Sequence, residues 1–144
     1  MPDKNLPIGV FDSGMGGLTV MRALRARLPG ENLLYLGDTA RLPYGTKSAD
    51  TVTRYALSAA HALTARGIKM LVVACNTVSG QALPALTEAL APLPVIGVIV
   101  PGAEAAIAAA HGAPIAVIAT EGTVTSGAYV RAIHALAPDL PVVQ

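Results

Sequence analysis

The sequence predicts an α/β protein whose open parallel sheet is flanked by helices. Short apolar runs alternate with longer segments of helical period, which is the order of an α/β fold. The apolar runs are continuous rather than alternating with polar residues, as is typical of parallel strands covered on both faces. The 144 residues are 53% hydrophobic and 13% charged. This composition argues against disorder, and the length is sufficient for a hydrophobic core.

Five short runs rich in Val, Ile and Leu are the expected strands. In chain order they are Ile8–Phe11, Leu33–Leu36, Met70–Ala74, Val95–Ile99 and Ile115–Ala119. Because helical segments separate them, we expect the strands to be parallel. The closing residues, Pro141-Val142-Val143-Gln144, read as the start of a further strand. Since a domain rarely ends by beginning a strand, the chain is expected to be a fragment of a longer protein.

The segments between the strands are rich in alanine and leucine and have helical period. The expected helices are Leu18–Leu28, Ala49–Arg66, Ser79–Ala91, Ala103–His111 and Thr125–Ala137. Ser48 and Thr123 suit helix N-caps, and Gly67 and Gly112 are expected to end the second and fourth helices. Prolines at 92, 94 and 101 mark residues 92–102 as a boundary. We therefore expect residues 1–97 to form a first α/β lobe and residues 98–144 to begin a second.

Composition also excludes several classes of function. The formal net charge is +1, with no cluster of Lys or Arg and one Phe, so a nucleic-acid partner is not expected. The longest uncharged stretch, Met70–Thr87, contains Gly80 and Pro84 and would make a poor membrane span. No secretory signal precedes the first strand, and one cysteine cannot form an internal disulfide. These features predict a cytoplasmic protein with no membrane partner.

Polar clusters follow four of the expected strands. They are Asp12-Ser13, Gly37-Asp38-Thr39, Cys75-Asn76-Thr77 and Thr120-Glu121-Gly122-Thr123. Because ligands of parallel α/β sheets bind at the carboxyl ends of the strands, we expect these clusters to converge on one cleft.

Two glycine-containing loops leave alternatives open. DSGMGG, residues 12–17, is either an anion cradle or a tight turn, and it lacks both the P-loop pattern and the GxGxxG spacing. Its Asp12 could act as an acid/base partner or merely cap the turn. The loop LGDTARLPYGTKS, residues 36–48, could carry specificity or be a solvated connection.

The single cysteine, Cys75, has three interpretations. It could be a small buried hydrophobic residue, which is a common fate of free cysteine. A hydrolase nucleophile would need an adjacent histidine, but all three histidines fall within or at the ends of expected helices. Redox chemistry would favour a second cysteine. As a general base near a helix N-terminus, Cys75 could provide a thiolate, with Asn76 and Thr77 as hydrogen-bond donors to a ligand.

Five segments together resemble glutamate racemases, a branch of the cofactor-independent aspartate/glutamate racemase superfamily. They are IGVFDSGMGGLTV, YLGDTARLPYGTKS, VVACNTVSGQALP, PVIGVIVPGA and IATEGTVTSGAYVRAI. The resemblance implies a two-lobed fold, of which this chain holds the opening part of the first lobe and part of the second. The returning segment that completes the first lobe would lie beyond residue 144.

The resemblance also implies a reaction and its residues. Members interconvert L- and D-glutamate with no cofactor and no metal, by two cysteines on opposite faces of the α-carbon, and supply D-glutamate for peptidoglycan. Cys75 matches the cysteine that serves the D-enantiomer, and Asp12 matches the carboxylate that assists it. The matching substrate contacts are Ser13, Tyr44, Gly45, Asn76, Thr77, Thr120 and Thr123. The complete protein would be a homodimer.

This sequence departs from the family because the second cysteine, in a Cys-Thr-His motif, is absent. The isolated chain is therefore expected to be inactive. Three hypotheses remain: the N-terminal part of a glutamate racemase, a non-catalytic amino-acid-binding module, or another racemase of the superfamily, such as an aspartate racemase.

Overall fold

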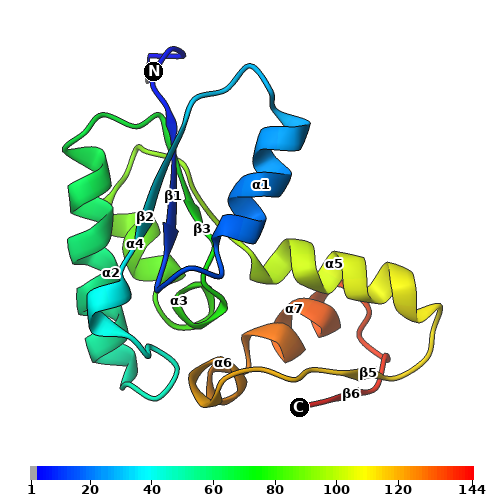
Figure 1. Cartoon of the computed structure of the whole chain (residues 1–144). Helices are drawn as coiled ribbons and strands as arrows, with labels where there is room; N and C mark the ends of the chain where they lie inside the picture. The colour runs from blue at the N-terminus through cyan, green and yellow to red at the C-terminus, as the bar shows by residue number, and fades with distance from the viewer. Residues whose placement is uncertain (1–2) are drawn as a thin grey trace.

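The computed structural model describes residues 3–144, and its central element is a four-stranded parallel sheet. The strand order is β2-β1-β3-β4, and every neighbouring pair is parallel. The strands are β1 (Ile8–Asp12), β2 (Leu33–Gly37), β3 (Met70–Val73) and β4 (Val95–Gly97). Figure 1 shows helices on both sides of this sheet. The predicted fold class, an open parallel sheet flanked by helices, is confirmed.

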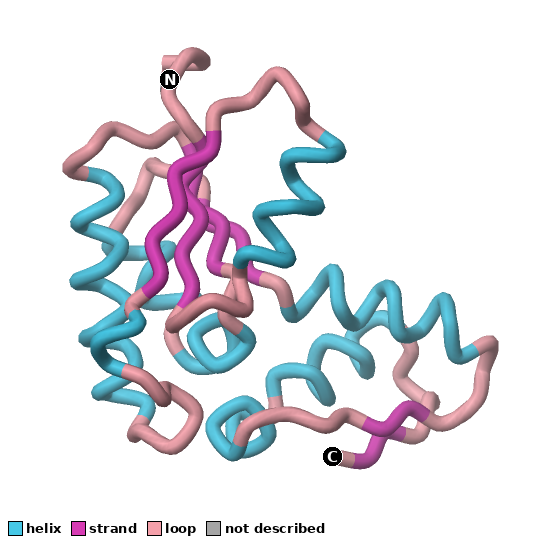
Figure 2. Tube along the Cα trace, in the orientation of Figure 1, coloured by secondary structure: helices cyan, strands magenta, loops and turns pink. Residues whose placement is uncertain are grey.

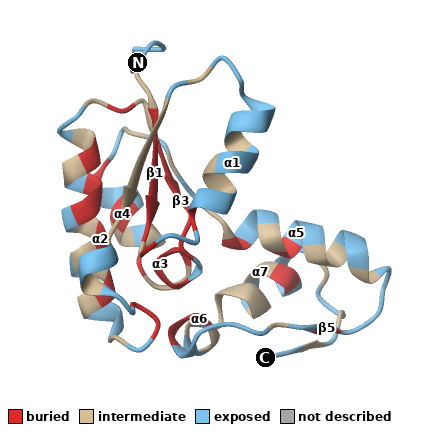
Figure 3. Ribbon diagram, viewed as in Figure 1, coloured by how far each residue is buried: buried red, intermediate tan, exposed pale blue. Residues whose placement is uncertain are grey.

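The two faces of the sheet are covered by different helices. α1 (Leu18–Arg27) packs on one face, where its Met21 joins a cluster with Val10. α2 (Ala49–Thr64) and α4 (Leu83–Ala89) cover the other face, where Phe11 lies in the larger core cluster. Because successive residues of a strand point to opposite faces, neighbouring residues of β1 enter separate cores. Figure 3 accordingly shows β1 buried along its length, and β3 is buried after its first residue, Met70.

Five further elements follow β4. They are α5 (Ile99–Ala110), β5 (Ile115–Ala116), α6 (Glu121–Ser126), α7 (Ala128–Leu136) and β6 (Val142–Val143). β5 and β6 form a two-stranded parallel sheet, which Figure 2 shows apart from the larger one. β6 confirms that a strand begins within residues 141–144, as expected. Ala103, Ile115 and Ile133 form a small core beneath α5. We call residues 8–97 the N-terminal unit and residues 98–144 the C-terminal unit.

The prediction of one helix over Ser79–Ala91 is wrong. The segment forms two helices, α3 (Asn76–Gln81) and α4, which meet at Ala82. Ala82 has φ −123° and ψ −4°, outside helical geometry. A continuous helix would need a backbone N–H at residue 84 to bond the carbonyl of Gly80, and Pro84 has none. Pro84 instead occupies the first turn of α4, where no such donor is needed.

The boundaries near residues 92–102 also differ from the prediction. β4 ends at Gly97, and α5 begins at Ile99 rather than at Ala103. Pro101 therefore lies inside the helix, but in its first turn, where backbone N–H groups have no intrahelical acceptor.

The last third of the chain contains further corrections. β5 is limited to two residues, so the expected strand over Ile115–Ala119 is too long. The helix expected over Thr125–Ala137 is α6 and α7, separated by Gly127 at φ 62°. Thr123 is not an N-cap, because it lies within α6, whereas Ser48 caps α2 as predicted by accepting a bond from the Thr51 N–H.

Within residues 3–144, no helix combines the length and the apolar character that a membrane crossing requires. The same residues contain no group of three or more His, Cys, Asp and Glu side chains placed to hold a metal ion.

Candidate functional site

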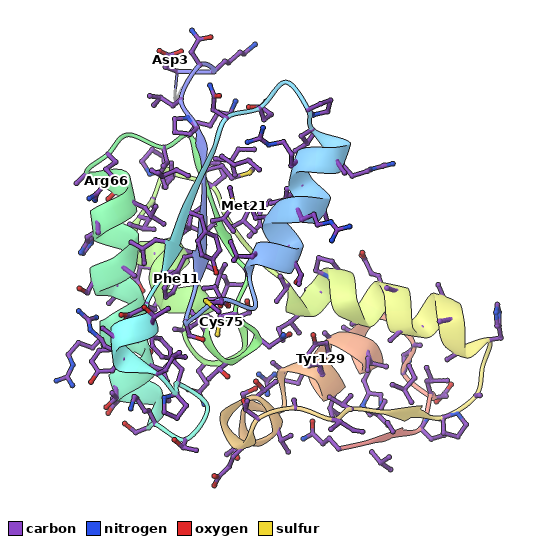
Figure 4. All side chains as sticks on the ribbon, in the orientation of Figure 1. Asp3, Phe11, Met21, Arg66, Cys75 and Tyr129 are labelled. Atoms are coloured by element: carbon purple, nitrogen blue, oxygen red, sulfur yellow. The ribbon has the colours of Figure 1, made fainter. Side chains whose placement is uncertain are left out.

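A cleft of about 610 Å³ lies where the carboxyl ends of β1 and β3 face the C-terminal unit. Seven of the nine predicted site residues line it: Asp12, Ser13, Cys75, Asn76, Thr77, Thr120 and Thr123. Figure 4 shows Cys75 at the end of the sheet and Tyr129 on the helices across from it. Three of the four strand-end clusters therefore meet, as expected. The fourth, at Gly37-Asp38-Thr39, does not line the cleft, which corrects that part of the prediction.

The turn after β1 is held from two sides. Asp12 is buried, and its Oδ2 accepts a hydrogen bond of 2.9 Å from the Gly14 N–H. The Tyr35 hydroxyl donates to the Gly14 carbonyl at 2.8 Å. Burial raises the pKa of Tyr35 to about 12, and the nearby ionisable side chains of Asp12 and Cys75 add smaller contributions. Tyr35 therefore stays protonated at neutral pH and remains a donor to this turn.

Cys75 occupies the N-cap position of α3, two residues after the buried end of β3 at Val73. Its side chain is only 7% exposed, yet it lines the cleft. The thiol donates a hydrogen bond to the Ser13 hydroxyl, with 3.3 Å between Sγ and Oγ. The loops after β1 and β3 thus place a thiol and a hydroxyl beside each other because the two strands are neighbours in the sheet.

Three threonine hydroxyls form a closed triangle between the two units. Thr77 of α3 lies 2.9 Å from Thr120 and 3.3 Å from Thr123, measured between Oγ1 atoms. Thr120 and Thr123 are 3.1 Å apart. Thr77 and Thr123 are buried, whereas Thr120 is exposed. The triangle joins the beginnings of α3 and α6, and all three threonines line the cleft.

Tyr44 and Gly45 are the two predicted site residues that do not line the cleft. Tyr44 is 2% exposed, and its hydroxyl donates to Asp38 at 2.5 Å. Its ring packs edge-on against Phe11. Burial and this hydrogen bond raise the pKa of Tyr44. Gly45 lies against the C-terminal unit, because its carbonyl accepts a bond of 2.8 Å from the Gly122 N–H.

The cleft contains almost no charged side chains. Asp12 is the only charged residue among the described residues that line it, and no Lys, Arg or His is present there. The three histidines of the chain are exposed and lie elsewhere. A bound carboxylate would therefore be held by neutral donors such as backbone N–H groups, hydroxyls and the Asn76 amide.

A family model described as Asp/Glu/hydantoin racemase matches residues 8–143. The chain belongs to this family. A glutamate racemase from Geobacter metallireducens is 54% identical over 136 residues, which are 94% of this chain and 50% of the relative. A glutamate racemase from Limosilactobacillus fermentum is 52% identical over 96% of this chain and 52% of its own length. The chain therefore spans about half the length of the curated relatives that it matches.

Solved structures of glutamate racemases agree with the fold. Glutamate racemase RacE1 from Bacillus anthracis superimposes with a TM-score of 0.92 at 46% identity, over 97% of this chain and 52% of that one. Glutamate racemase from Francisella tularensis in complex with D-glutamate gives a TM-score of 0.87 at 42% identity, over 96% of this chain and 51% of that one.

For this member of the racemase family, the sequence prediction missed two side chains at the site. Tyr35 supports the turn after β1, and Tyr129 lines the cleft and donates to the Asn76 side chain at 2.7 Å. Both residues lie inside regular elements, where a tyrosine is ordinarily part of the packing. The apolar run around Tyr35 and the helical period around Tyr129 contain no signal that would distinguish them.

Proposed function

We propose that this chain is the first half of a glutamate racemase, which interconverts L- and D-glutamate by proton transfer at the α-carbon without a cofactor or a metal. The observation that carries the proposal is the single thiol of Cys75. It lines the cleft, it is bonded to Ser13, and it follows β3 in a chain of the racemase family. The structures of relatives with bound glutamate support the choice of substrate.

In the proposed reaction, the Cys75 thiolate removes the α-proton of D-glutamate and becomes a thiol. We propose that Asp12 is the carboxylate that assists Cys75. When Cys75 is a thiolate, the Ser13 hydroxyl can reverse its hydrogen bond and donate to sulfur, because a hydroxyl is both donor and acceptor. The base must be close to the α-carbon and well aimed, since this proton is very weakly acidic.

The neutral donors of the cleft would hold the substrate and the developing negative charge. Asn76, Thr77 and the backbone N–H groups at the start of α3 can donate to the α-carboxylate, whose oxygens gain charge as the proton leaves. Ser13, Thr120 and Thr123 would complete the contacts. For Tyr44 and Gly45 we propose backbone contacts, because the Tyr44 hydroxyl is already bonded to Asp38.

Racemisation needs a proton donor on each face of the α-carbon, and the chain contains one cysteine. We propose that the second thiol lies in the other half of the protein, beyond residue 144, together with the segment that completes the first lobe. The N-terminal unit, with residues 1–7, and the C-terminal unit would then be parts of two lobes divided after residue 97. Two-base chemistry would be incomplete in the isolated 144-residue chain.

The test follows the α-proton of D-glutamate and of L-glutamate by NMR in D₂O. In the isolated chain we expect Cys75-dependent exchange from D-glutamate at most, with no L-glutamate formed. In the full-length protein we expect interconversion of both enantiomers. Cys75→Ser should lower that rate by about 10²- to 10⁴-fold, the usual contribution of a positioned acid/base group, with an unchanged circular dichroism spectrum. Full activity in this variant would contradict the role of Cys75.

Two added measurements, glutamate binding and the same exchange assay with aspartate, separate the alternatives. Binding of glutamate by the full-length protein without proton exchange would indicate a non-catalytic binding module, and faster turnover of aspartate would indicate another racemase. For the complete protein we also propose a homodimer in the cytoplasm that supplies D-glutamate for peptidoglycan synthesis.

A further inference from the structure

We infer that Tyr129 is a positioning residue for Asn76: its hydroxyl fixes the Asn76 amide so that the NH₂ group faces the substrate cleft. The inference rests on the proposed function, because it assigns Tyr129 to the same site. Tyr129 belongs to α7 of the C-terminal unit, and Asn76 is the first residue of α3 in the N-terminal unit. Both residues line the cleft.

The hydrogen bond between them has a defined direction. The Tyr129 hydroxyl donates to Oδ1 of Asn76 at 2.7 Å. An asparagine amide has an acceptor oxygen at one end and two donor hydrogens at the other. When Oδ1 is occupied by a donor, Nδ2 and both of its hydrogens are left for a ligand. A carboxylate, which only accepts hydrogen bonds, requires this orientation and would be repelled by the reverse one.

Asn76 needs such a partner because its side chain is exposed. Within residues 3–144, the bond from Tyr129 is the one hydrogen bond that holds its amide oxygen. Without it, the amide would be free to rotate and would bond water through either end. Fixing the orientation before substrate arrives lowers the ordering cost of binding.

The surroundings of Tyr129 give its hydroxyl room beside α5 and keep it protonated, so that it can donate a hydrogen bond. A Cβ atom at position 102 would lie 3.0 Å from the hydroxyl oxygen, so Gly102 of α5 leaves the room that the phenol occupies. Burial raises the pKa of Tyr129, which keeps the group protonated at neutral pH. The C-terminal unit thereby sets the orientation of a side chain that the N-terminal unit contributes.

The experiment compares Tyr129→Phe with the wild-type chain of residues 1–144. Phenylalanine keeps the ring and removes only the hydroxyl. The first readout is the side-chain ¹⁵N–¹H₂ pair of Asn76, assigned by its absence in Asn76→Ala. The second is the affinity for D-glutamate, measured by NMR titration. Tyr55→Phe is the matched control, because Tyr55 is partly buried, packs against Tyr44 at the edge of the larger core cluster and does not line the cleft.

We expect the Asn76 pair to shift in Tyr129→Phe and not in Tyr55→Phe. The affinity for D-glutamate should fall about three- to ten-fold, the value of one hydrogen bond. In an Asn76→Ala background, Tyr129→Phe should change the affinity by less than two-fold, because the positioned group is gone.

An unchanged Asn76 pair in Tyr129→Phe would overturn the inference, and so would an unchanged affinity. If the wild-type chain binds no D-glutamate, the same titrations are run on the full-length protein. Failure of that protein to bind glutamate would refute the proposed function itself. The side-chain NMR signals test the hydrogen bond to Asn76 independently of that result.

Discussion

The hydrogen bonds of the threonine triangle between the two units predict how much stability a single substitution should remove. Thr123→Val keeps the shape of the side chain and removes its hydroxyl, which is bonded to Thr77 at 3.3 Å and to Thr120 at 3.1 Å. Thr123 is 2% exposed, so water cannot replace these bonds. Each hydrogen bond contributes about 1 kcal/mol net, and the substitution should therefore lower the free energy of unfolding by roughly 2 kcal/mol.

The triangle also predicts that two such substitutions are not additive. Thr123→Val and Thr77→Val each remove two bonds, but the double variant removes three, because the bond between these residues is counted in both single variants. The sum of the single effects should exceed the double effect by about 1 kcal/mol. Thr120, which remains, is exposed and can bond water.

The measurement is urea denaturation followed by circular dichroism, together with thermal melting. A loss of about 2 kcal/mol corresponds to a midpoint lower by roughly 4–8 °C in a chain of this size. Thr125→Val is the matched control, because Thr125 lies in the same helix and is exposed. It should change the stability by less than about 0.5 kcal/mol. Equal effects of Thr123→Val and Thr125→Val would refute the reasoning.

Two further predictions concern the turn after β1. The pKa of Tyr35, raised to about 12 from 10.0, makes stability fall as the pH rises between these values, because the unfolded chain loses the phenol proton first. Tyr35→Phe should remove this part of the pH dependence of urea unfolding, and the same dependence in both proteins would contradict it. Gly17→Ala should destabilise by about 1–3 kcal/mol, because its Cβ would lie 2.5 Å from Cβ of buried Asp12. In Gly16→Ala, the Cβ meets no atom within 4 Å and the cost should be small; equal melting temperatures for these two variants would argue against the clash.

Much of the larger sheet could be predicted from local sequence, because its strands are continuous apolar runs. The first three predicted strands agree with the structure to within one residue at each end. The ends of the helices were harder to predict. The break at Ala82 depends on the missing N–H of Pro84, whereas Pro101 falls where no N–H is needed and does not interrupt α5. The same residue type therefore has opposite consequences at different distances from a helix start.

The cleft residues that directly follow a strand could be predicted from the sequence. Cys75 and Asp12 follow neighbouring parallel strands, and this topology brings them to one edge of the sheet. Side chains that reach the cleft from the middle of an element could not be predicted in this way. Tyr129 approaches Asn76 because α7 packs near α3, and this contact between residues 53 positions apart depends on tertiary structure alone.

The cleft combines residues from two units, and its hydrogen bonds show how they depend on each other. Thr77 and Asn76, at the start of α3, are bonded to Thr120 and Tyr129 of the C-terminal unit. The Cys75 thiol instead bonds within the N-terminal unit, to Ser13. A change that separates the units would therefore leave the proposed base in place while it disorders the proposed donors. Because binding depends on those donors and proton removal on the thiol, we expect such changes to weaken the affinity for D-glutamate before they alter the reactivity of Cys75.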